Sequence, residues 1–203
     1  MQLSSQSFDN GRPIPAGFAA GDATGFAANR NPQLAWSDVP AGTRSFALVC
    51  VDPDVPTVPE LVGRDDVTIP LEQPRGDFIH WVMVDIPATL REIAAGSCSE
   101  GFTARGKQRP AGPQGARQGV NDYTAWFAGN PDMAGTYRGY DGPYPPFNDE
   151  RVHRYFFRLF ALDVERLPVD GDFTAADVYR AMHGHVLAEA AVHGTYTLNP
   201  ALA

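Results

Sequence analysis

The sequence predicts a mainly β protein of the α+β class, built as a sandwich of antiparallel sheets with a C-terminal helix and one or two minor helices. The 203 residues include 18 prolines and 20 glycines with no repeating period, which is typical of many turns between short elements. Between the turns lie apolar runs of strand length, rich in β-branched and aromatic residues. With 43% hydrophobic residues to form a core, we expect a single domain over residues 1–203.

The first half of the chain supplies short strands and one strongly apolar strand. Residues 1–30 are rich in Gly, Ala, Asp and Pro with scattered Phe, and we expect a strand or two and an N-terminal arm over the core. Residues 34–36 predict a short strand, and residues 45–51 predict a strand buried on both faces that delivers Asp52 at its end. Residues 57–76 mix prolines with acids, which favours a surface loop or lid.

The second half supplies two more strong strands and the helix. Residues 78–86 predict a buried strand that is closed by Pro87, and residues 153–163 predict an aromatic one. We expect a short helical piece over residues 88–95. Near the end, Thr174 and Asp177 form a capping-box pattern, and apolar residues follow at helical spacing as far as Ala190, which predicts the C-terminal helix.

The charge and the cysteines narrow the functional classes. The net charge of −8 disfavours nucleic acid and anionic membranes as partners, since both require a basic surface. No run of about 18 apolar residues predicts membrane insertion, and the amino terminus has no basic and apolar leader pattern, so we expect a soluble, cytoplasmic protein. Cys50 lies in an apolar run and Cys98 in a Gly/Ser-rich turn, which favours reduced thiols over a disulfide.

Polar side chains at the ends of the predicted strands indicate a small anion pocket. His80 and His153 lie near the starts of two strands, and Asp52 follows a third. Two imidazoles can donate hydrogen bonds to phosphate oxygens, with added charge when they are protonated. We expect the ligand to lie between these three residues under the stiff Gly142-Pro143 loop, with Asp52 orienting a histidine or receiving an ammonium group.

Several segments, taken in order, resemble the phosphatidylethanolamine-binding protein family, in particular its bacterial Raf-kinase-inhibitor-like (YbhB/YbcL) branch. They are Asn-Pro at 31–32, Leu-Ala-Trp-Ser at 34–37, Asp-Pro-Asp at 52–54, His-Trp-Val at 80–82, Asn-Asp-Tyr at 121–123, Gly-Pro-Tyr-Pro-Pro at 142–146, His-Arg-Tyr at 153–155, Ala-Leu-Asp at 161–163, Gly-His-Val-Leu-Ala at 184–188 and Gly-Thr-Tyr at 194–196.

The resemblance implies a binding protein that is not an enzyme and needs no cofactor or metal. Its cavity for phosphate-like groups would be lined by Asp52, His80, Gly142, Pro143, His153 and Tyr155. It further implies a homodimer and the restraint of a kinase or another signalling partner. The chain departs from the branch at Tyr144, where many relatives have cysteine, and at residues 124–138, which look like an insertion.

Other readings of these residues are weaker. Asp52 and Asp54 supply too few oxygens for a divalent cation, and His183, His185 and His193 are spaced as helix-surface or helix-packing residues, not as a metal site. A hydrolase or lyase that uses His80 and His153 as acid and base is the alternative function. It lacks a nucleophile in a suitable setting, because the neighbours of Cys50 are apolar.

Two loops leave alternatives open. The basic residues of segment 105–121 predict a solvated loop more readily than a binding patch. The insertion at 124–138 carries Trp126, Phe127, Met133 and Tyr137, which must be buried somewhere. They can pack over the pocket mouth, form a dimer contact, or fold back on their own sheet.

Overall fold

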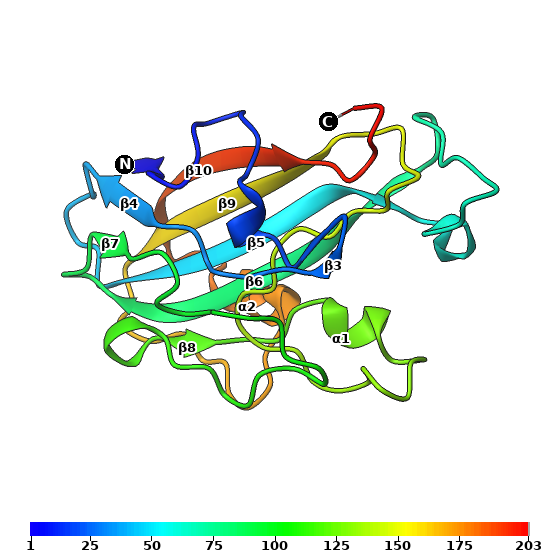
Figure 1. Cartoon of the computed structure of the whole chain (residues 1–203). Coiled ribbons are helices and arrows are strands. Elements are labelled where there is room, and N and C mark those ends of the chain that lie inside the picture. Colours follow the sequence, from blue (N-terminus) through cyan, green and yellow to red (C-terminus); the bar gives the residue numbers. More distant parts are fainter. Residues whose placement is uncertain (203) are drawn as a thin grey trace.

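A computed structural model describes residues 1–202, and its main feature is a five-stranded antiparallel sheet in the order β10-β9-β5-β6-β8 (Figure 1). The strands are β5 (Ser45–Pro56), β6 (Arg75–Pro87), β8 (Arg117–Gln118), β9 (His153–Leu162) and β10 (Val186–Tyr196). The three strong strands predicted from the sequence form its centre, because their apolar side chains are buried on both faces.

A second, three-stranded sheet packs against one face of the main sheet, as expected for a sandwich. It contains β1 (Gln2–Ser4), β4 (Leu34–Ser37) and β7 (Glu92–Ile93) in the order β1-β4-β7. Trp36 of β4 packs edge-on against Phe46 of β5, with ring centroids 5.4 Å apart, in a core that also holds Trp81 and Phe157. The central strands alternate, so that Val49 and Val82 face the other side, where Val178 of helix α2 (Ala175–Ala181) covers them.

The remaining elements are short. The hairpin of β2 (Gly21–Asp22) and β3 (Gly25–Phe26) and the helix α1 (Tyr123–Trp126) lie near one another, and single helical turns occur at η1 (Ala16–Phe18), η2 (Pro59–Leu61) and η3 (Pro113–Gly115). The N-terminal arm is fastened to the main sheet: the N–H of Gly11 and of Ile14 donate to the carbonyls of His193 and Thr195. Phe8 and Ile14 are buried there.

The predicted C-terminal helix begins correctly but is much shorter than expected. Thr174 and Asp177 form the capping box, whereas the helix ends at Ala181 and Gly184 reverses the chain with a φ of 81°. The residues from Val186 onward, predicted as helix, form strand β10, whose backbone pairs with β9 along its length. The prediction that His183, His185 and His193 are helix residues was therefore wrong as well.

Two further boundaries differ from the prediction. Residues 88–95 form a turn and strand β7 in place of a helix, because Ile93 is buried next to β4. Strand β5 continues past residue 51 to Pro56, so Asp52 and Asp54 lie within a strand instead of after it. The pairing of β5 with β6 is irregular between Asp52 and Val55.

Candidate functional site

The buried pair of Asp52 on β5 and His153 on β9 forms one wall of the site. The Nδ1–H of His153 donates to Asp52 Oδ2 at 2.6 Å, and Asp52 Oδ1 accepts the backbone N–H of Asp54 at 2.8 Å. Both side chains are about 1% exposed, although both line the pocket described below. The carboxylate of Asp52 thus orients a histidine, one of the two roles expected for it.

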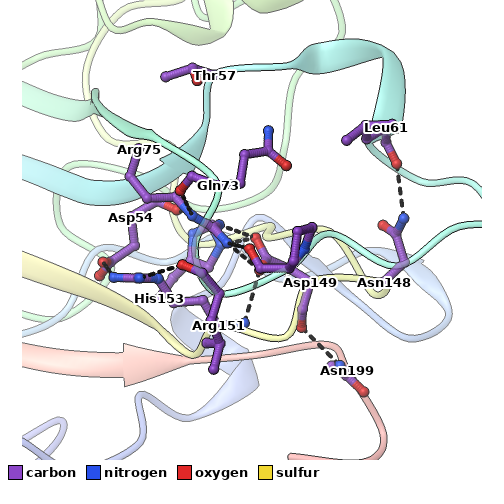
Figure 2. Close-up of polar contacts among 12 residues, drawn as sticks. Asp54, Thr57, Leu61, Gln73, Arg75, Asn148, Asp149, Arg151, His153 and Asn199 are labelled. Atoms are coloured by element: carbon purple, nitrogen blue, oxygen red, sulfur yellow. Dashed lines mark hydrogen bonds and ion pairs between the residues drawn. The ribbon is translucent and has the colours of Figure 1, made fainter.

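The second ring nitrogen of His153 is also occupied. Its Nε2–H donates to Asp149 Oδ2 at 3.1 Å, and Asp149 in turn binds the guanidinium of Arg75, with Nη2 3.0 Å from Oδ1 (Figure 2). Burial lowers the pKa of His153, but the hydrogen bonds to Asp149 and Asp52 outweigh it and raise the pKa to about 9. His153 is therefore an imidazolium that gives both N–H groups to carboxylates and keeps neither for a ligand.

Asp54 and Asp149 connect this wall to residues 57–76, the predicted surface loop, because Arg75 donates to the backbone carbonyl of Asp54 at 3.0 Å as well as to Asp149. Asp54 is held by Arg154, whose Nε and Nη2 lie 2.8 and 2.9 Å from its oxygens, so Asp52 and Asp54 serve different partners. Asn148, next to Asp149, donates to the carbonyl of Leu61 at 2.8 Å (Figure 2) and to that of Val67 at 2.8 Å. The predicted surface loop is therefore tied to the segment that leads into His153.

His80 on β6 differs from His153 in charge and in what it offers. Its Nδ1 lies 2.7 Å from the backbone carbonyl of Asp141, which only accepts, so Nδ1 carries the hydrogen. Burial lowers the pKa of His80 despite the opposing charge of Asp52. Its Nε2 makes no hydrogen bond to another residue of the described chain. His80 is therefore neutral near pH 7 and has a free lone pair at Nε2.

The segment Asp141–Pro143 is fixed by a buried polar network. The carboxylate of Asp141 binds the single lysine of the chain, Lys107, and accepts from the amide groups of Asn29 and Asn121 at 2.7 and 2.8 Å. Burial raises the pKa of Asp141, although Lys107 and the amides oppose this. Because the same residue presents its carbonyl to His80, the network sets the orientation of that imidazole.

Gly142 and Pro143 shape the loop without lining the pocket themselves. The Gly142 N–H donates to Asn29 Oδ1 at 2.8 Å, and a side chain at Gly142 would place its Cβ 2.2 Å from the carbonyl oxygen of Phe18. The Pro143 carbonyl accepts the N–H of Ala20 at 2.9 Å. The backbone at Gly142 thus closely approaches the N-terminal segment, and the residues that follow, from Tyr144 to Phe147, line the pocket.

The pocket above these residues has a volume of about 830 Å³ and opens to solvent. Its polar end carries Asp52, His80, His153 and the hydroxyl of Tyr155. Burial, together with the Asp52 carboxylate, raises the pKa of Tyr155 well above its ordinary value, so it stays a neutral phenol. The rest of the lining is mostly aromatic and aliphatic, and no arginine or lysine within residues 1–202 belongs to it.

Asp52, His80, His153 and Tyr155, which the sequence suggests as site residues, all line one pocket. The sequence did not indicate Asp149 and Asp141, which bind the two histidines. It also placed Lys107 and Arg117 in a solvated loop, whereas Lys107 binds Asp141 and Arg117 binds Asp85 at 2.7 Å. The position of Asp141 directly before Gly142-Pro143 and the occurrence of a single lysine were the available signals.

Residues 1–202 contain neither a cluster of metal-ligating side chains nor a reactive thiol. No group of three or more His, Cys, Asp or Glu within residues 1–202 is arranged to hold a metal ion. Cys50 and Cys98 are free and buried, and burial raises the pKa of both thiols. None of the helices in residues 1–202 has the length and apolar character needed to cross a membrane.

Known proteins are similar to this chain over most of its length. A family model described as phosphatidylethanolamine-binding protein matches residues 4–197. The UPF0098 protein of Aquifex aeolicus is 34% identical over 198 residues, which cover 97% of this chain and 88% of that protein. The UPF0098 protein YbhB of Escherichia coli is 34% identical over 169 residues, covering 83% and 82% of the two chains.

Two solved structures are also similar to this chain over almost all of its length. The crystal structure of Escherichia coli YbcL, described as a new member of the mammalian PEBP family, superposes with a TM-score of 0.71 at 28% identity and covers 97% of each chain. A putative PEBP homolog from Chlamydia trachomatis superposes with a TM-score of 0.65 at 31% identity, covering 96% of this chain and 95% of that one.

Proposed function

Because the chain belongs to the phosphatidylethanolamine-binding protein family, we propose that it is a non-catalytic binding protein for a small anionic or phosphorylated ligand held at His80. The observation that carries this proposal is the free Nε2 of a neutral His80, whose Nδ1–H is fixed by the carbonyl of Asp141. Asp52, His153 and Tyr155 enclose this end of the pocket, and Gly142 and Pro143 hold the loop beside it.

The charges around His80 define which form of the ligand is accepted. Asp52 and Asp149 neutralise the positive charge of His153, and no lysine or arginine of the described chain lines the pocket. A phosphate monoester has a second pKa of about 6 and so exists partly as a monoanion with one P–OH group. That P–OH donates to Nε2 of His80, or passes its proton to it. Either way the complex holds one proton more than a dianion beside a neutral imidazole.

We expect the affinity for methyl phosphate to fall as the pH rises from 6 to 8, because binding takes up one proton. One proton bound corresponds to a change approaching about tenfold per pH unit above both pKa values. Loss of a charged hydrogen bond, worth about 1.5–3 kcal/mol, means that His80→Ala should weaken binding at pH 6 by about tenfold or more and remove most of the pH dependence. Calorimetric titration at both pH values measures this.

The matched control is His185→Ala, because His185 is exposed and binds Asp163 outside the pocket. This variant should bind methyl phosphate like the wild type at both pH values. Equal affinities for the wild type and His80→Ala, or an affinity that is the same at pH 6 and 8, would contradict the proposed binding mode.

The alternative, a hydrolase or lyase with His80 and His153 as acid and base, has less support. His153 gives both nitrogens to carboxylates, and the raised pKa of the buried Cys50 thiol makes it a poor nucleophile. Turnover of ester and phosphoester substrates by the wild type, lost in His80→Ala, would favour the enzyme.

The proposal extends to the setting in which the protein works. The two free cysteines suit a reducing compartment, which supports a cytoplasmic location. A homodimer and the restraint of a kinase or another signalling partner are supported by the family resemblance alone. Light scattering measures the first of these directly.

A further inference from the structure

Exposed aromatic side chains gather at this pocket. Phe26, Trp126, Tyr144 and Phe147 are 52%, 43%, 38% and 41% exposed, and all four line the pocket. Exposed aromatic residues that occur singly need no explanation, whereas a contiguous group on a soluble protein marks a binding surface. The group lies at the end of the pocket formed by the β2-β3 hairpin, α1 and the 144–147 loop.

These four residues, Phe26, Trp126, Tyr144 and Phe147, form an aromatic wall that packs against further aromatic residues of the protein. Phe26 stacks on Phe102, with ring centroids 4.4 Å apart and planes within 5° of parallel, and Phe102 packs edge-on against Tyr123 and Phe127. Tyr137, fully buried, donates its hydroxyl to the Met133 carbonyl at 2.8 Å. The insertion at 124–138 thus folds back on the protein through Phe127 and Tyr137 and places Trp126 at the pocket mouth, so the wall is formed before any ligand binds.

The wall is continuous with the polar end of the pocket. The rings of Phe78 and Tyr123 lie 4.9 and 5.6 Å from the imidazole of His80. The total volume of about 830 Å³ is far larger than a single phosphoryl group needs and falls in the range of about 300–1,000 Å³ typical of pockets for drug-sized molecules. A phosphoryl group at the polar end of the pocket, beside His80, leaves most of the volume and nearly all of the apolar lining for a second part of the same ligand.

We propose that Phe26, Phe78, Trp126, Phe127 and Tyr144 form a second subsite for an aromatic ring, so that the ligand is an aryl-bearing anion such as an aryl phosphate. Ring faces and edges are both presented, since Phe26 and Tyr144 meet at 65° with centroids 5.8 Å apart, and aromatic rings favour such offset and edge-to-face partners. An uncharged ring also needs no lysine or arginine in its lining. The identity of the anionic end rests on the proposed function, whereas the aromatic subsite stands on its own contacts.

Three phosphate monoesters separate the contributions to binding: methyl, cyclohexyl and phenyl phosphate. Burial of a ring from water predicts that phenyl phosphate binds the wild type at least about tenfold more tightly than methyl phosphate. The aromatic contacts predict that it also binds several-fold more tightly than cyclohexyl phosphate. Trp126 reports the event, because Trp36 and Trp81 are buried and only Trp126 of the three tryptophans is accessible to acrylamide. Phenyl phosphate should protect its fluorescence from quenching.

Two variants test the location of the subsite by calorimetry. Trp126→Ala, at an exposed position, should lower the ratio of phenyl to methyl phosphate affinity several-fold, because four of the five aromatic residues remain, whereas Tyr179→Ala should leave the ratio as in the wild type. Tyr179 is an exposed aromatic residue of α2 that does not line the pocket. An unchanged ratio in Trp126→Ala, or equal affinities for phenyl and methyl phosphate in the wild type, would overturn the subsite. Equal affinities for phenyl and cyclohexyl phosphate would overturn its preference for an aromatic ring.

Benzyl alcohol, which has a ring but no charge, tests the aromatic subsite independently of the proposed anion site at His80. If methyl phosphate does not bind but benzyl alcohol protects Trp126 from acrylamide, the aromatic subsite is supported and the anion site is wrong. If methyl phosphate binds through His80 but neither phenyl phosphate nor benzyl alcohol protects Trp126, the anion site stands and the subsite is wrong.

Discussion

Replacing Asp149 by alanine is expected to lower the free energy of unfolding by about 3–5 kcal/mol, the range found when one partner of a buried ion pair is removed. Asp149 is 1% exposed and neutralises two cations, Arg75 and the imidazolium of His153 (Figure 2). Burial alone would raise the pKa of Asp149, but the hydrogen bonds from His153 and Arg75 lower it. Without this carboxylate the guanidinium of Arg75 keeps only the backbone carbonyls of Asp54, Pro70 and Gln73, and the imidazolium of His153 keeps only Asp52.

Chemical denaturation with urea measures this loss, and the matched control is Asp66→Ala. Asp66 also binds an arginine through two oxygens, Arg64, but both side chains are largely exposed. Exposed pairs contribute about 0–1 kcal/mol, so the control should stay close to the wild type. If Asp149→Ala is no less stable than Asp66→Ala, the buried network does not hold this part of the fold together.

The free energy of unfolding should also fall as the pH rises above 6.5. The folded pKa of His153 is about 9, above its unfolded value of about 6.5, so the stabilisation from its charge is complete below pH 6.5 and is lost as the pH rises toward 9. One pKa unit corresponds to about 1.4 kcal/mol, which predicts a decline of about 1–2 kcal/mol between pH 6.5 and 8. His80, whose pKa is lowered in the folded state, opposes this decline by at most about 0.4 kcal/mol, because in the unfolded state it is half protonated at pH 6.5 and neutral at pH 8.

Urea denaturation at intervals between pH 6.5 and 8 tests whether the free energy of unfolding falls as the pH rises. The window ends at pH 8 because the two buried thiols, with raised pKa values, add a decline of their own near pH 8.5 and above. A stability that is constant or rises over this range would show that His153 is not held as an imidazolium between Asp52 and Asp149.

The strands were predictable where burial dominates the sequence pattern. The central strands β5, β6 and β9 carry unbroken apolar and β-branched runs, and the sequence places all three correctly. Strand β10 was predicted as helix because Val186, Leu187 and Ala190 have helical spacing. It is an edge strand with exposed apolar residues at its start, so the alternation that marks a half-buried strand is missing, and only its pairing with β9 defines it.

The site was predictable as a set of residues but not as a division of roles. The convergence of Asp52, His80 and His153 was predicted from positions near the ends of the predicted strands, although in the structure only His153 begins a strand, whereas Asp52 and His80 lie within β5 and β6. What distinguishes the two histidines is their partners: Asp149, tied to Arg75 from 74 positions away, and Asp141, tied to Lys107 from 34 positions away. The contacts with Arg75 and Lys107 are long-range and leave no local pattern in the sequence, and they fix the two carboxylate-bearing residues that make one imidazole charged and fully bonded and the other neutral and free.

The most direct test of the central claim is nitrogen-15 NMR of the histidine side chains during a titration with methyl phosphate at pH 6.5. The chain has five histidines, and we expect Nε2 of His80 to begin unprotonated and to move to the protonated, hydrogen-bonded range as the ligand saturates. Both nitrogens of His153 should remain protonated throughout. A saturating ligand that leaves the His80 resonances in place, or that shifts only His183, His185 or His193, would contradict an anion site at His80.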